Sequence, residues 1–205
     1  STGSVTFLGT VSPAGGNLKE PVTDSTKKAA RCFYALSQER ADGKRYPAVD
    51  PIDSYSKYLE YEQVKEYLKK EISPDWNELI DDTKNIILRG KESKEQINIL
   101  GDDSVPLDYH IRFWNSELID FVFLQQDAFD SIDADCPLER QNFMLQLILS
   151  ICHTEFTFES FEEISTYYKR IINALKQMNY SEYNSEAFKK YMNEVNEIVK
   201  ERSAK

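Results

Sequence analysis

Two histidines, three cysteines and three pairs of adjacent acidic residues are the side chains that could bind a metal or do nucleophilic or acid–base chemistry. The histidines are His110 and His153, and neither has a partner at a metal-ligand spacing. Cys152 and His153 are adjacent, so on a helix they point about 100° apart and cannot both face one ion. We therefore expect no metal site in this chain.

The cysteines and the acidic pairs give no catalytic pattern. Cys136 and Cys152 lie in apolar, helical sequence surroundings, where buried thiols are usually inert. With Cys32 they form an odd, widely spaced set, which indicates reduced thiols in place of a disulfide framework. Adjacent acidic residues most often belong to a solvated helix face, and here they are Asp81-Asp82, Asp102-Asp103 and Glu162-Glu163. We predict no catalytic residue in this chain.

The sequence also has no phosphate-binding loop. The pattern G-x-x-x-x-G-K-[ST] needs two glycines five positions apart, followed by lysine and a hydroxyl residue. The Gly-Lys pairs are Gly43-Lys44 and Gly90-Lys91, but Gln38 and Asn85 occupy the positions where the first glycine would stand. Neither pair is followed by Ser or Thr. Any phosphate chemistry would have to come from outside this chain.

Two aromatic residues stand at positions that could serve a binding site. Tyr46 precedes Pro47 in a short, rigid segment between helices, and Phe129 ends the run 123–129 at an expected helix C-terminus. Aromatic faces give rigid contact area and can stack on a nucleotide base. On the pattern alone, an ordinary core role for both rings remains the favoured interpretation.

Composition and charge narrow the class of protein. The 205 residues are 40% hydrophobic, which is ordinary for a globular core and argues against intrinsic disorder. With 25 basic and 35 acidic residues the net charge is −10, so a nucleic-acid partner would be repelled on average. No stretch approaches 18 uninterrupted apolar residues, and no signal peptide is recognised. We expect a cytoplasmic chain with no direct membrane insertion and no nucleic-acid partner.

The order of the expected elements divides the chain in two. The β-branched segment Ser4–Val11 predicts one buried strand, which runs into a turn at Ser12–Asn17. A lone strand has no ladder partner, so residues 1–52 resemble the edge of a larger sheet domain that also carries a helix over Thr26–Leu36. Residues 53–205 are helical by periodicity, and we predict a bundle of about six or seven helices.

Helix starts and apolar stripes support the bundle. Ser73–Asp75 places a hydroxyl at a cap and proline at the first helical position. Ser160–Glu163 is a capping-box pattern. Two stripes with a spacing of three and four residues predict core-facing helices: Met144, Leu145, Ile148, Leu149, Ile151 and Cys152, and Phe188, Tyr191, Met192, Val195, Ile198 and Val199.

Three ordered blocks of the sequence resemble the catalytic A (alpha) subunit of V-type and A-type rotary ATPases. Residues 12–23, S-P-A-G-G-N-L-K-E-P-V-T, are similar to the family signature S-P-P-G-G-D-x-x-E-P-V-T. Residues 44–56 resemble the aromatic-Pro-Ala segment and the S-Y-S that follows it. Residues 123–139 resemble F-L-Q-Q-N-A-F with its downstream C-P-L-E. After about residue 155 the resemblance is weak.

The chain departs from the commonest family residues at several positions, which suggests a divergent branch. Asp42–Lys44 replaces a more basic stretch, and the single departures are Ala14, Asn17, Lys19 and Asp24. The aromatic positions are undisturbed.

The resemblance implies a mainly α fold. In it a helical bundle, the C-terminal domain over residues 53–205, follows a short strand-and-loop remnant of the α/β nucleotide-binding domain over residues 1–52. Tyr46 would stack on adenine and Phe129 would close the other side, with Pro47 in the same adenine pocket. The loop after Gly101 would be the rotor-facing tip, with Asp102, Asp103, Ser104, Val105 and Pro106 as its contact residues. A solvated loop without a partner is an equal alternative.

The family also implies a mechanism and partners. ATP or ADP with Mg²⁺ would bind in the full subunit, whose phosphate and Mg²⁺ ligands lie upstream of this chain, so the chain alone should be inactive. Nucleotide state would move the helical domain about a hinge at Asp42–Pro51 and so drive rotation and H⁺ or Na⁺ transport. Partners would be the B subunit in an alternating hexamer and the central-stalk rotor subunits, with membrane association only through the complex.

Two other interpretations remain open at this point. One is a stand-alone acidic helical module that binds another protein and has no catalysis. The other is the catalytic beta subunit of F-type ATP synthases, which fits residues 46–53 but neither the block at residues 12–23 nor Gln125-Gln126.

Overall fold

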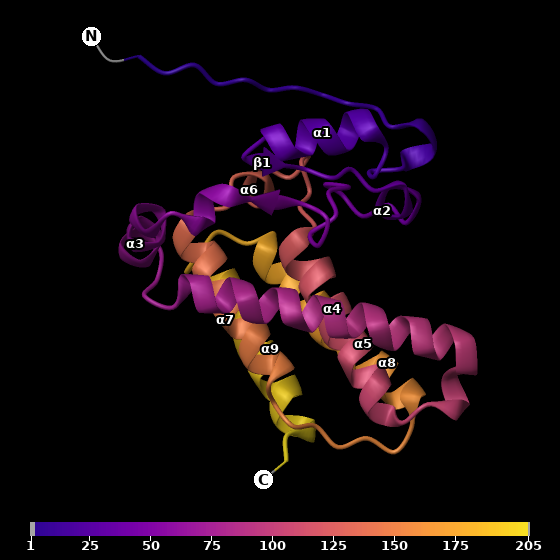
Figure 1. Cartoon of the computed structure of the whole chain (residues 1–205). Helices are drawn as coiled ribbons and strands as arrows, with labels where there is room; N and C mark the ends of the chain where they lie inside the picture. The colour runs from indigo at the N-terminus through magenta and orange to yellow at the C-terminus, as the bar shows by residue number, and fades with distance from the viewer. Residues whose placement is uncertain (1–2, 205) are drawn as a thin grey trace.

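A computed structural model describes residues 3–204 of the chain (Figure 1). The N-terminal elements are η1 (Ala14–Gly16), α1 (Pro21–Ala29), β1 (Cys32–Phe33), α2 (Gln38–Asp42), β2 (Tyr55–Ser56) and η2 (Lys57–Glu60). The helical part follows, with α3 (Glu62–Glu71), α4 (Trp76–Leu100), η3 (Asp102–Ser104), α5 (Leu107–Ile119), η4 (Asp120–Leu124), α6 (Ser131–Ala134), α7 (Leu138–Cys152), α8 (Phe161–Asn179) and α9 (Glu186–Arg202). The predicted mainly α fold class is confirmed.

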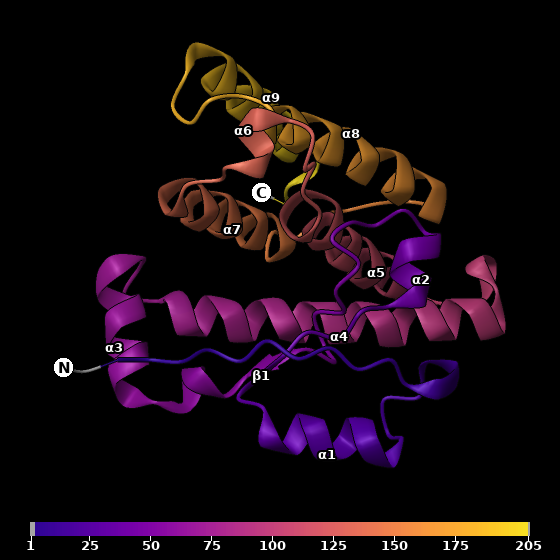
Figure 2. The same cartoon turned by 90° about the horizontal axis from the view of Figure 1, so that it is seen from above.

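The helical part is layered around the long helix α4. In Figure 2, α4 runs between the N-terminal elements α1 and β1 and the layer formed by α7, α8 and α9. One end of α4 joins α3, and the other end turns through η3 into α5. α4 and α5 thus form an antiparallel hairpin whose turn lies at the far end of the molecule from α3.

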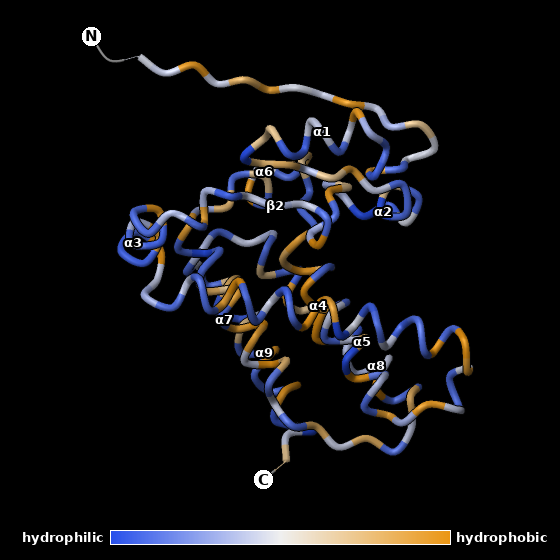
Figure 3. The backbone as a smooth tube through the Cα atoms, viewed as in Figure 1, coloured by the Kyte–Doolittle hydropathy of each residue, from blue (hydrophilic) through white to orange (hydrophobic). Residues whose placement is uncertain are grey.

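The expected strand at Ser4–Val11 is wrong. The segment is extended and pairs with no other part of residues 3–204, and Val5, Phe7 and Leu8 are 90%, 95% and 87% exposed. In Figure 3 it carries apolar residues although it runs outside the folded body. A strand needs a neighbour to satisfy its backbone groups, and within residues 3–204 no neighbouring strand is available to this segment. The β-branched composition therefore has no ladder to join.

The expected helix at Thr26–Leu36 is shifted. α1 already begins at Pro21, where the Glu20 carboxylate accepts a hydrogen bond from the Thr23 hydroxyl at 2.9 Å and proline occupies the first position. It ends at Ala29, because the chain then enters β1. This strand pairs antiparallel with β2 in the register Cys32 to Ser56 and Phe33 to Tyr55. A two-residue pairing between distant segments leaves no periodic pattern that could predict it.

The core lies between α8 and its neighbours, as both predicted stripes indicate. In α7, Met144, Leu145, Ile148, Leu149 and Ile151 are at most 3% exposed. In α9, Phe188, Val195 and Ile198 are buried, while Tyr191, Met192 and Val199 are half-buried at the edge of the same cluster. α8 contributes a fully buried row that includes Tyr168, Ile171 and Leu175.

One predicted helix start is confirmed and one is displaced. The Ser160 hydroxyl accepts a hydrogen bond from the Glu163 N–H at 3.3 Å, and the Glu163 carboxylate reaches back to the Glu159 N–H at 3.1 Å. Ser73 does not cap α4, which begins at Trp76 after Asp75. The Ser73 carbonyl instead accepts a hydrogen bond from the Trp76 N–H at 3.1 Å, which makes residues 73–76 a turn before the helix.

Candidate functional site

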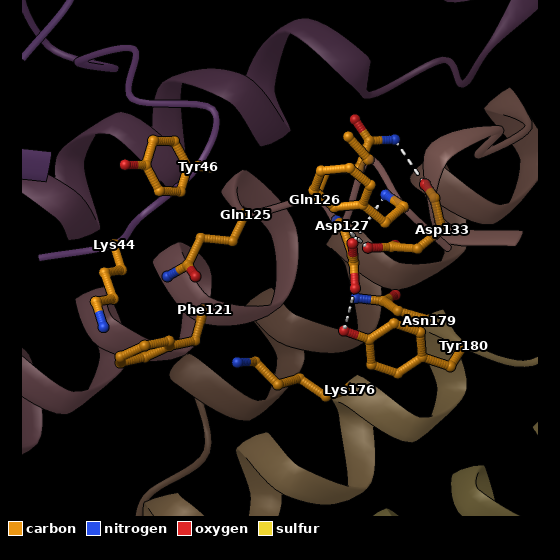
Figure 4. Close-up of a pocket in the computed structure, with 12 residues that line it drawn as sticks. Lys44, Tyr46, Phe121, Gln125, Gln126, Asp127, Asp133, Lys176, Asn179 and Tyr180 are labelled. Atoms are coloured by element: carbon orange, nitrogen blue, oxygen red, sulfur yellow. Dashed lines mark hydrogen bonds between the residues drawn. The ribbon is translucent and has the colours of Figure 1, made fainter. Parts of the chain in front are cut away.

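A pocket of about 520 Å³ opens where residues 44–46 meet the loop after η4 and the end of α8 (Figure 4). We call it the aromatic pocket. Its lining residues come from three separate parts of the chain: Lys44 and Tyr46; Phe121, Gln125, Gln126, Asp127, Ala128, Phe129 and Asp133; and Lys176, Asn179 and Tyr180. This size is typical of small-molecule sites.

The structure brings Tyr46 and Phe129 to the same pocket. Tyr46 is 55% exposed and Phe129 is fully exposed, so neither ring is a core aromatic. The expectation that Phe129 lies at a helix C-terminus is wrong: η4, a π-helical turn, ends at Leu124, and Phe129 lies in the loop beyond it. The Asp127 carboxylate accepts a hydrogen bond from the Phe129 N–H at 2.9 Å and shapes that loop. Pro47 is exposed and is not among the lining residues.

Local hydrogen bonds fix the backbone that carries Tyr46. The Ser37 hydroxyl caps α2 by accepting a hydrogen bond from the Arg40 N–H at 3.2 Å. After α2 the Arg45 N–H donates to the Arg40 carbonyl at 2.8 Å. The Tyr46 carbonyl then accepts a hydrogen bond from the Gln126 N–H at 3.0 Å. The two walls of the aromatic pocket are therefore joined backbone to backbone.

Four charged side chains lie beneath the wall of the pocket that carries Tyr46. Arg45 donates to both carboxylate oxygens of Glu117, at 2.9 and 2.8 Å, and also binds Asp120. Arg40 binds the other Asp120 oxygen at 2.8 Å. The hydrogen bonds to Glu117, opposed by desolvation and assisted by Asp120, raise the pKa of the Arg45 guanidinium above its already high value. Arg45 is therefore charged at every pH at which the protein folds.

A second network shapes the loop on the Phe129 side. The Gln126 amide donates to the Asp133 carbonyl at 2.7 Å, and the Asp127 N–H donates to the Asp133 carboxylate at 2.6 Å. Burial raises the pKa of Asp133, while the hydrogen bond from Asp127 and the charge of Arg140 act in the opposite direction. The Tyr180 hydroxyl lies 3.4 Å from the Asp127 carboxylate. Burial, and to a smaller extent the negative charge of Asp127, raises the pKa of Tyr180.

Several lining residues have no counterpart in the sequence-based prediction. Gln125 and Gln126 lie inside a recognised motif, which could have indicated them. Lys176 and Tyr180 are one turn apart at the end of α8, in a region without a recognised motif, and only the helical spacing relates them. The Lys176 ammonium lies 4.9 Å from the centre of the Phe121 ring, which fixes one side of the pocket.

The predicted tip, residues 101–106, is the turn between α4 and α5. Asp102, Asp103, Ser104 and Pro106 are exposed, as a contact surface requires. Val105 is only 8% exposed, because its side chain is turned into the protein, so it is not available to a partner. The His110 Nε2 atom lies 3.0 Å from the Asp102 carbonyl and ties the turn to α5.

Two of the thiols within residues 3–204 lie in different surroundings. Burial raises the pKa of the Cys152 thiol, whereas Cys136 lies in the loop before α7, where its sulfur accepts a hydrogen bond from Arg140 Nε at 3.0 Å. Residues 3–204 contain no group of three or more His, Cys, Asp or Glu side chains that could hold a metal ion. None of the helices described is both long and apolar enough to cross a membrane.

Family models match the two parts of the chain separately. Residues 1–56 match the nucleotide-binding domain of the ATP synthase alpha/beta family. Residues 65–184 match the C-terminal domain of V and A type ATP synthase.

Curated relatives agree with these matches. A V-type ATP synthase alpha chain from Protochlamydia amoebophila is 36% identical over 203 residues, which cover 99% of this chain and 34% of the relative. The V-type ATP synthase alpha chain of Chlamydia trachomatis is 37% identical over 190 residues, covering 93% and 32%. That of Borrelia duttonii is 36% identical over 193 residues, covering 93% and 31%. The chain thus spans about a third of the length of these relatives.

A solved structure has a similar fold. It is described as a unique ATP synthase subunit, NeqB, from Nanoarcheaum equitans, and it covers 69% of this chain and 33% of its own with a TM-score of 0.55 and 23% identity. These findings favour the rotary ATPase interpretation over a stand-alone interaction module. Because the C-terminal domain model matches more than half of the residues, the chain belongs to the V-type and A-type ATP synthase family and corresponds to the C-terminal region of the alpha subunit.

Proposed function

We propose that the aromatic pocket is the adenine end of the nucleotide site of an ATP-driven rotary enzyme, with Tyr46 stacking on the base and Phe129 closing the other side. The observation that carries this proposal is the meeting of these two exposed rings at one pocket of about 520 Å³. Exposed aromatic faces without a packing partner are suited to stacking on a base. The phosphate-binding loop and the Mg²⁺ ligands belong to the upstream part of the full subunit.

The charge around the pocket fits a nucleotide. Lys44 and Lys176 both line it, and each would lie near an anionic ligand. On the opposite side, the Asp133 carboxylate accepts a hydrogen bond from the Asp127 backbone N–H, and the Asp127 carboxylate accepts one from the Tyr180 hydroxyl. The positive side of the pocket is therefore the side toward which phosphates would extend.

The helical part is proposed to act as the lever that pushes the rotor. α5 begins directly after the tip and continues through η4 into the pocket wall at Phe121. Thirteen helical residues give a rod of roughly 20 Å. One continuous element therefore connects the proposed nucleotide contact with the proposed rotor contact, which comprises Asp102, Asp103, Ser104 and Pro106.

The remaining assignments follow from the family. Residues 1–52 would be the edge of the nucleotide-binding domain and residues 53–205 the lever domain, in keeping with family matches at 1–56 and 65–184. The full subunit would alternate with B subunits in a hexamer and contact the central-stalk rotor subunits. It would lie on the cytoplasmic side of a membrane, held there through the complex, and would couple ATP synthesis or hydrolysis to H⁺ or Na⁺ transport.

The test is steady-state ATP hydrolysis by the assembled enzyme with substitutions in the full subunit. Tyr46→Ala and Phe129→Ala each remove a stacking contact of about 1–3 kcal/mol, which corresponds to a KM for ATP raised about 5- to 150-fold. Tyr46→Phe keeps the ring and should keep the KM. Tyr34→Ala serves as the control, because it removes a ring that is 70% exposed and lies outside the pocket. An unchanged KM in both alanine variants would refute the proposal.

A further inference from the structure

We propose that four charged side chains form a latch that fixes the Tyr46 segment to the helical part, so that both walls of the aromatic pocket move as one unit. The latch consists of Arg40, Arg45, Glu117 and Asp120. These are positioning residues: none of them lines the pocket, and each acts through the backbone or the ring of a residue that does. The change in the KM for ATP that the latch predicts rests on the proposed function, whereas the change in hydrogen exchange that it predicts does not.

Every carboxylate oxygen in the latch has a guanidinium partner. Arg45 occupies both Glu117 oxygens, and Asp120 gives one oxygen to Arg45 and the other to Arg40. Two elements of the N-terminal part, α2 and the segment after it, are thereby held on α5 and η4. Bidentate guanidinium–carboxylate pairs are directional, so they fix orientation as well as distance.

The latch is far more buried than the surface ion pairs of the chain. The side chains of Arg40 and Asp120 are each 11% exposed, Glu117 is 13% exposed and Arg45 is 24% exposed. The bidentate pair between Arg170 and Glu201, which joins α8 to α9, is 49% and 46% exposed. Exposed pairs contribute little to stability, whereas loss of one partner from a buried pair leaves an uncompensated charge. The latch therefore constrains the structure far more than the surface pair does.

The latch lies directly behind both walls of the pocket. Arg45 precedes Tyr46 in the chain, and its guanidinium lies 4.7 Å from the centre of the Phe121 ring. Asp120 precedes Phe121, and the Asp120 carbonyl accepts a hydrogen bond from the Gln125 N–H at 3.0 Å. Gln126 then donates its N–H to the Tyr46 carbonyl. Displacement of Arg45 would thus move Tyr46 and the opposite wall together.

This geometry changes where the chain can bend. The segment Asp42–Pro51 was the expected hinge, yet its first half is held on α5 by Arg45 and on the loop after η4 by Tyr46. A hinge must absorb a change in backbone angles without breaking buried contacts. Residues 40–46 therefore belong to the helical side of any bending point, and Tyr46 travels with the lever.

The experiment measures hydrogen exchange and ATP hydrolysis on the same assembled enzyme. Arg45→Met removes the charge at similar length, Glu117→Gln removes one negative charge without changing shape, and Arg45→Lys keeps the charge but loses the bidentate geometry. Arg170→Met is the matched control, because it breaks a bidentate Arg–Glu pair that is exposed. Exchange is read in peptides covering residues 44–48 and 124–128, with α8 as the internal reference.

We expect Arg45→Met and Glu117→Gln to speed exchange in both peptides about tenfold or more and to leave α8 unchanged. The KM for ATP should rise about tenfold, with kcat at saturating ATP unchanged within about twofold, because only the positioning of a binding contact is lost. Arg45→Lys should show smaller changes in both hydrogen exchange and KM than Arg45→Met, and Arg170→Met should change neither quantity.

The outcomes separate the latch from the function on which its kinetic readout rests. Faster exchange without a change in KM would support the latch and overturn the adenine assignment of the pocket. Exchange equal to that of the Arg170→Met control in both peptides would overturn the latch. If Arg45→Met does not assemble, Glu117→Gln and Arg45→Lys give the same readouts with milder changes.

Discussion

The carbonyl of Tyr46 and the backbone N–H of Gln126 form a hydrogen bond of 3.0 Å between two segments that are far apart in the sequence. Each segment carries part of a different family motif, so this bond is the point at which the motifs meet. Tyr46 and Phe129 face one pocket as a consequence, although nothing in their local sequence relates them.

The 205-residue chain alone should bind ATP at best in the millimolar range. Two stacking contacts give about 1–3 kcal/mol each, whereas association costs about 4–15 kcal/mol in lost freedom of motion. Residues 3–204 provide no phosphate-binding loop to make up the difference. Titration calorimetry with ATP measures the affinity, and Tyr46→Ala is the control for any heat observed. A micromolar dissociation constant that survives in Tyr46→Ala would show a different binding site.

Sequence patterns predicted the elements whose signals are local. The stripe ending at Cys152, the stripe beginning at Phe188 and the Ser160 cap each depend on neighbours within two helical turns, and all three are present. Ser4–Val11 has strand propensity but forms no strand, because no other segment of residues 3–204 pairs with it, and the missing partner was already evident from the sequence. The pairing of Cys32 with Ser56 leaves no periodic trace, since it involves two residues in each strand.

The candidate site was predictable only in part, for a similar reason. Tyr46 and Phe129 were identified because they lie in recognisable motifs. Arg45 and Glu117 could not be paired from the sequence, because an ion pair depends on the path of the chain between its members. Lys176 lies on a helix whose stripe predicts which residues face the core, but a residue at the border of a pocket is half-buried and breaks that binary pattern.

Gly90→Ala should destabilise the α4–α5 hairpin. A Cβ atom at Gly90 would lie 2.2 Å from the Ser116 Cβ and 3.1 Å from the Arg112 carbonyl, so the helices would have to separate. Overpacking of this kind costs about 1–3 kcal/mol, against a helix-propensity gain of about 0.5–1 kcal/mol. We expect a net loss of roughly 1–2 kcal/mol in urea unfolding.

The double variant Gly90→Ala with Ser116→Gly makes that prediction specific. Removing the Ser116 Cβ restores space at the crossing, so most of the lost stability should return. Lys91→Ala, at an exposed position on the same helix, should change the free energy of unfolding by less than about 0.5 kcal/mol. An additive loss in the double variant would show that the crossing is not where the strain arises.

Arg140→Met should be strongly destabilising, and more so at neutral pH than at low pH. The Arg140 side chain is 1% exposed, donates to the Asn179 carbonyl at 3.0 Å and lies 3.5 Å from the Asp133 carboxylate. Removing one partner of a buried pair costs about 3–5 kcal/mol. Burial already raises the pKa of Asp133 and Arg140 lowers it, so the substitution raises that pKa further.

The sign of the pH dependence follows from that shift. A carboxyl whose pKa is raised by folding favours the folded state below its ordinary pKa of 3.8, and this contribution is lost as the pH rises through the raised value. The loss in the free energy of unfolding caused by Arg140→Met should therefore be smaller at pH 4.5 than at pH 7, as measured by urea unfolding. Arg112→Met, which breaks an exposed pair with Asp108, is the control. Equal deficits at both pH values would contradict this assignment.

Tyr167 should make the fold sensitive to alkaline pH. Its hydroxyl donates to the Ile198 carbonyl at 2.8 Å, and burial, assisted by the charge of Glu201, raises its pKa to about 12. Only the neutral phenol can donate this hydrogen bond. The stabilising contribution is therefore fully present below the ordinary phenol pKa of 10.0 and is lost as the pH rises through about 12. The unfolded chain loses the proton first, so stability should fall across this range.

Tyr167→Phe separates this effect from general alkaline denaturation. Below pH 10 the variant should lose about 0.5–1.5 kcal/mol, because one hydrogen bond is missing. Above pH 10 its stability should fall less steeply than that of the parent, since one phenol with a raised pKa is gone. Guanidinium unfolding between pH 8 and pH 11 measures both quantities. Tyr67→Phe, at a position 62% exposed on α3, should follow the parent curve. If Tyr167→Phe also follows it, the buried hydroxyl of Tyr167 does not couple folding to alkaline pH.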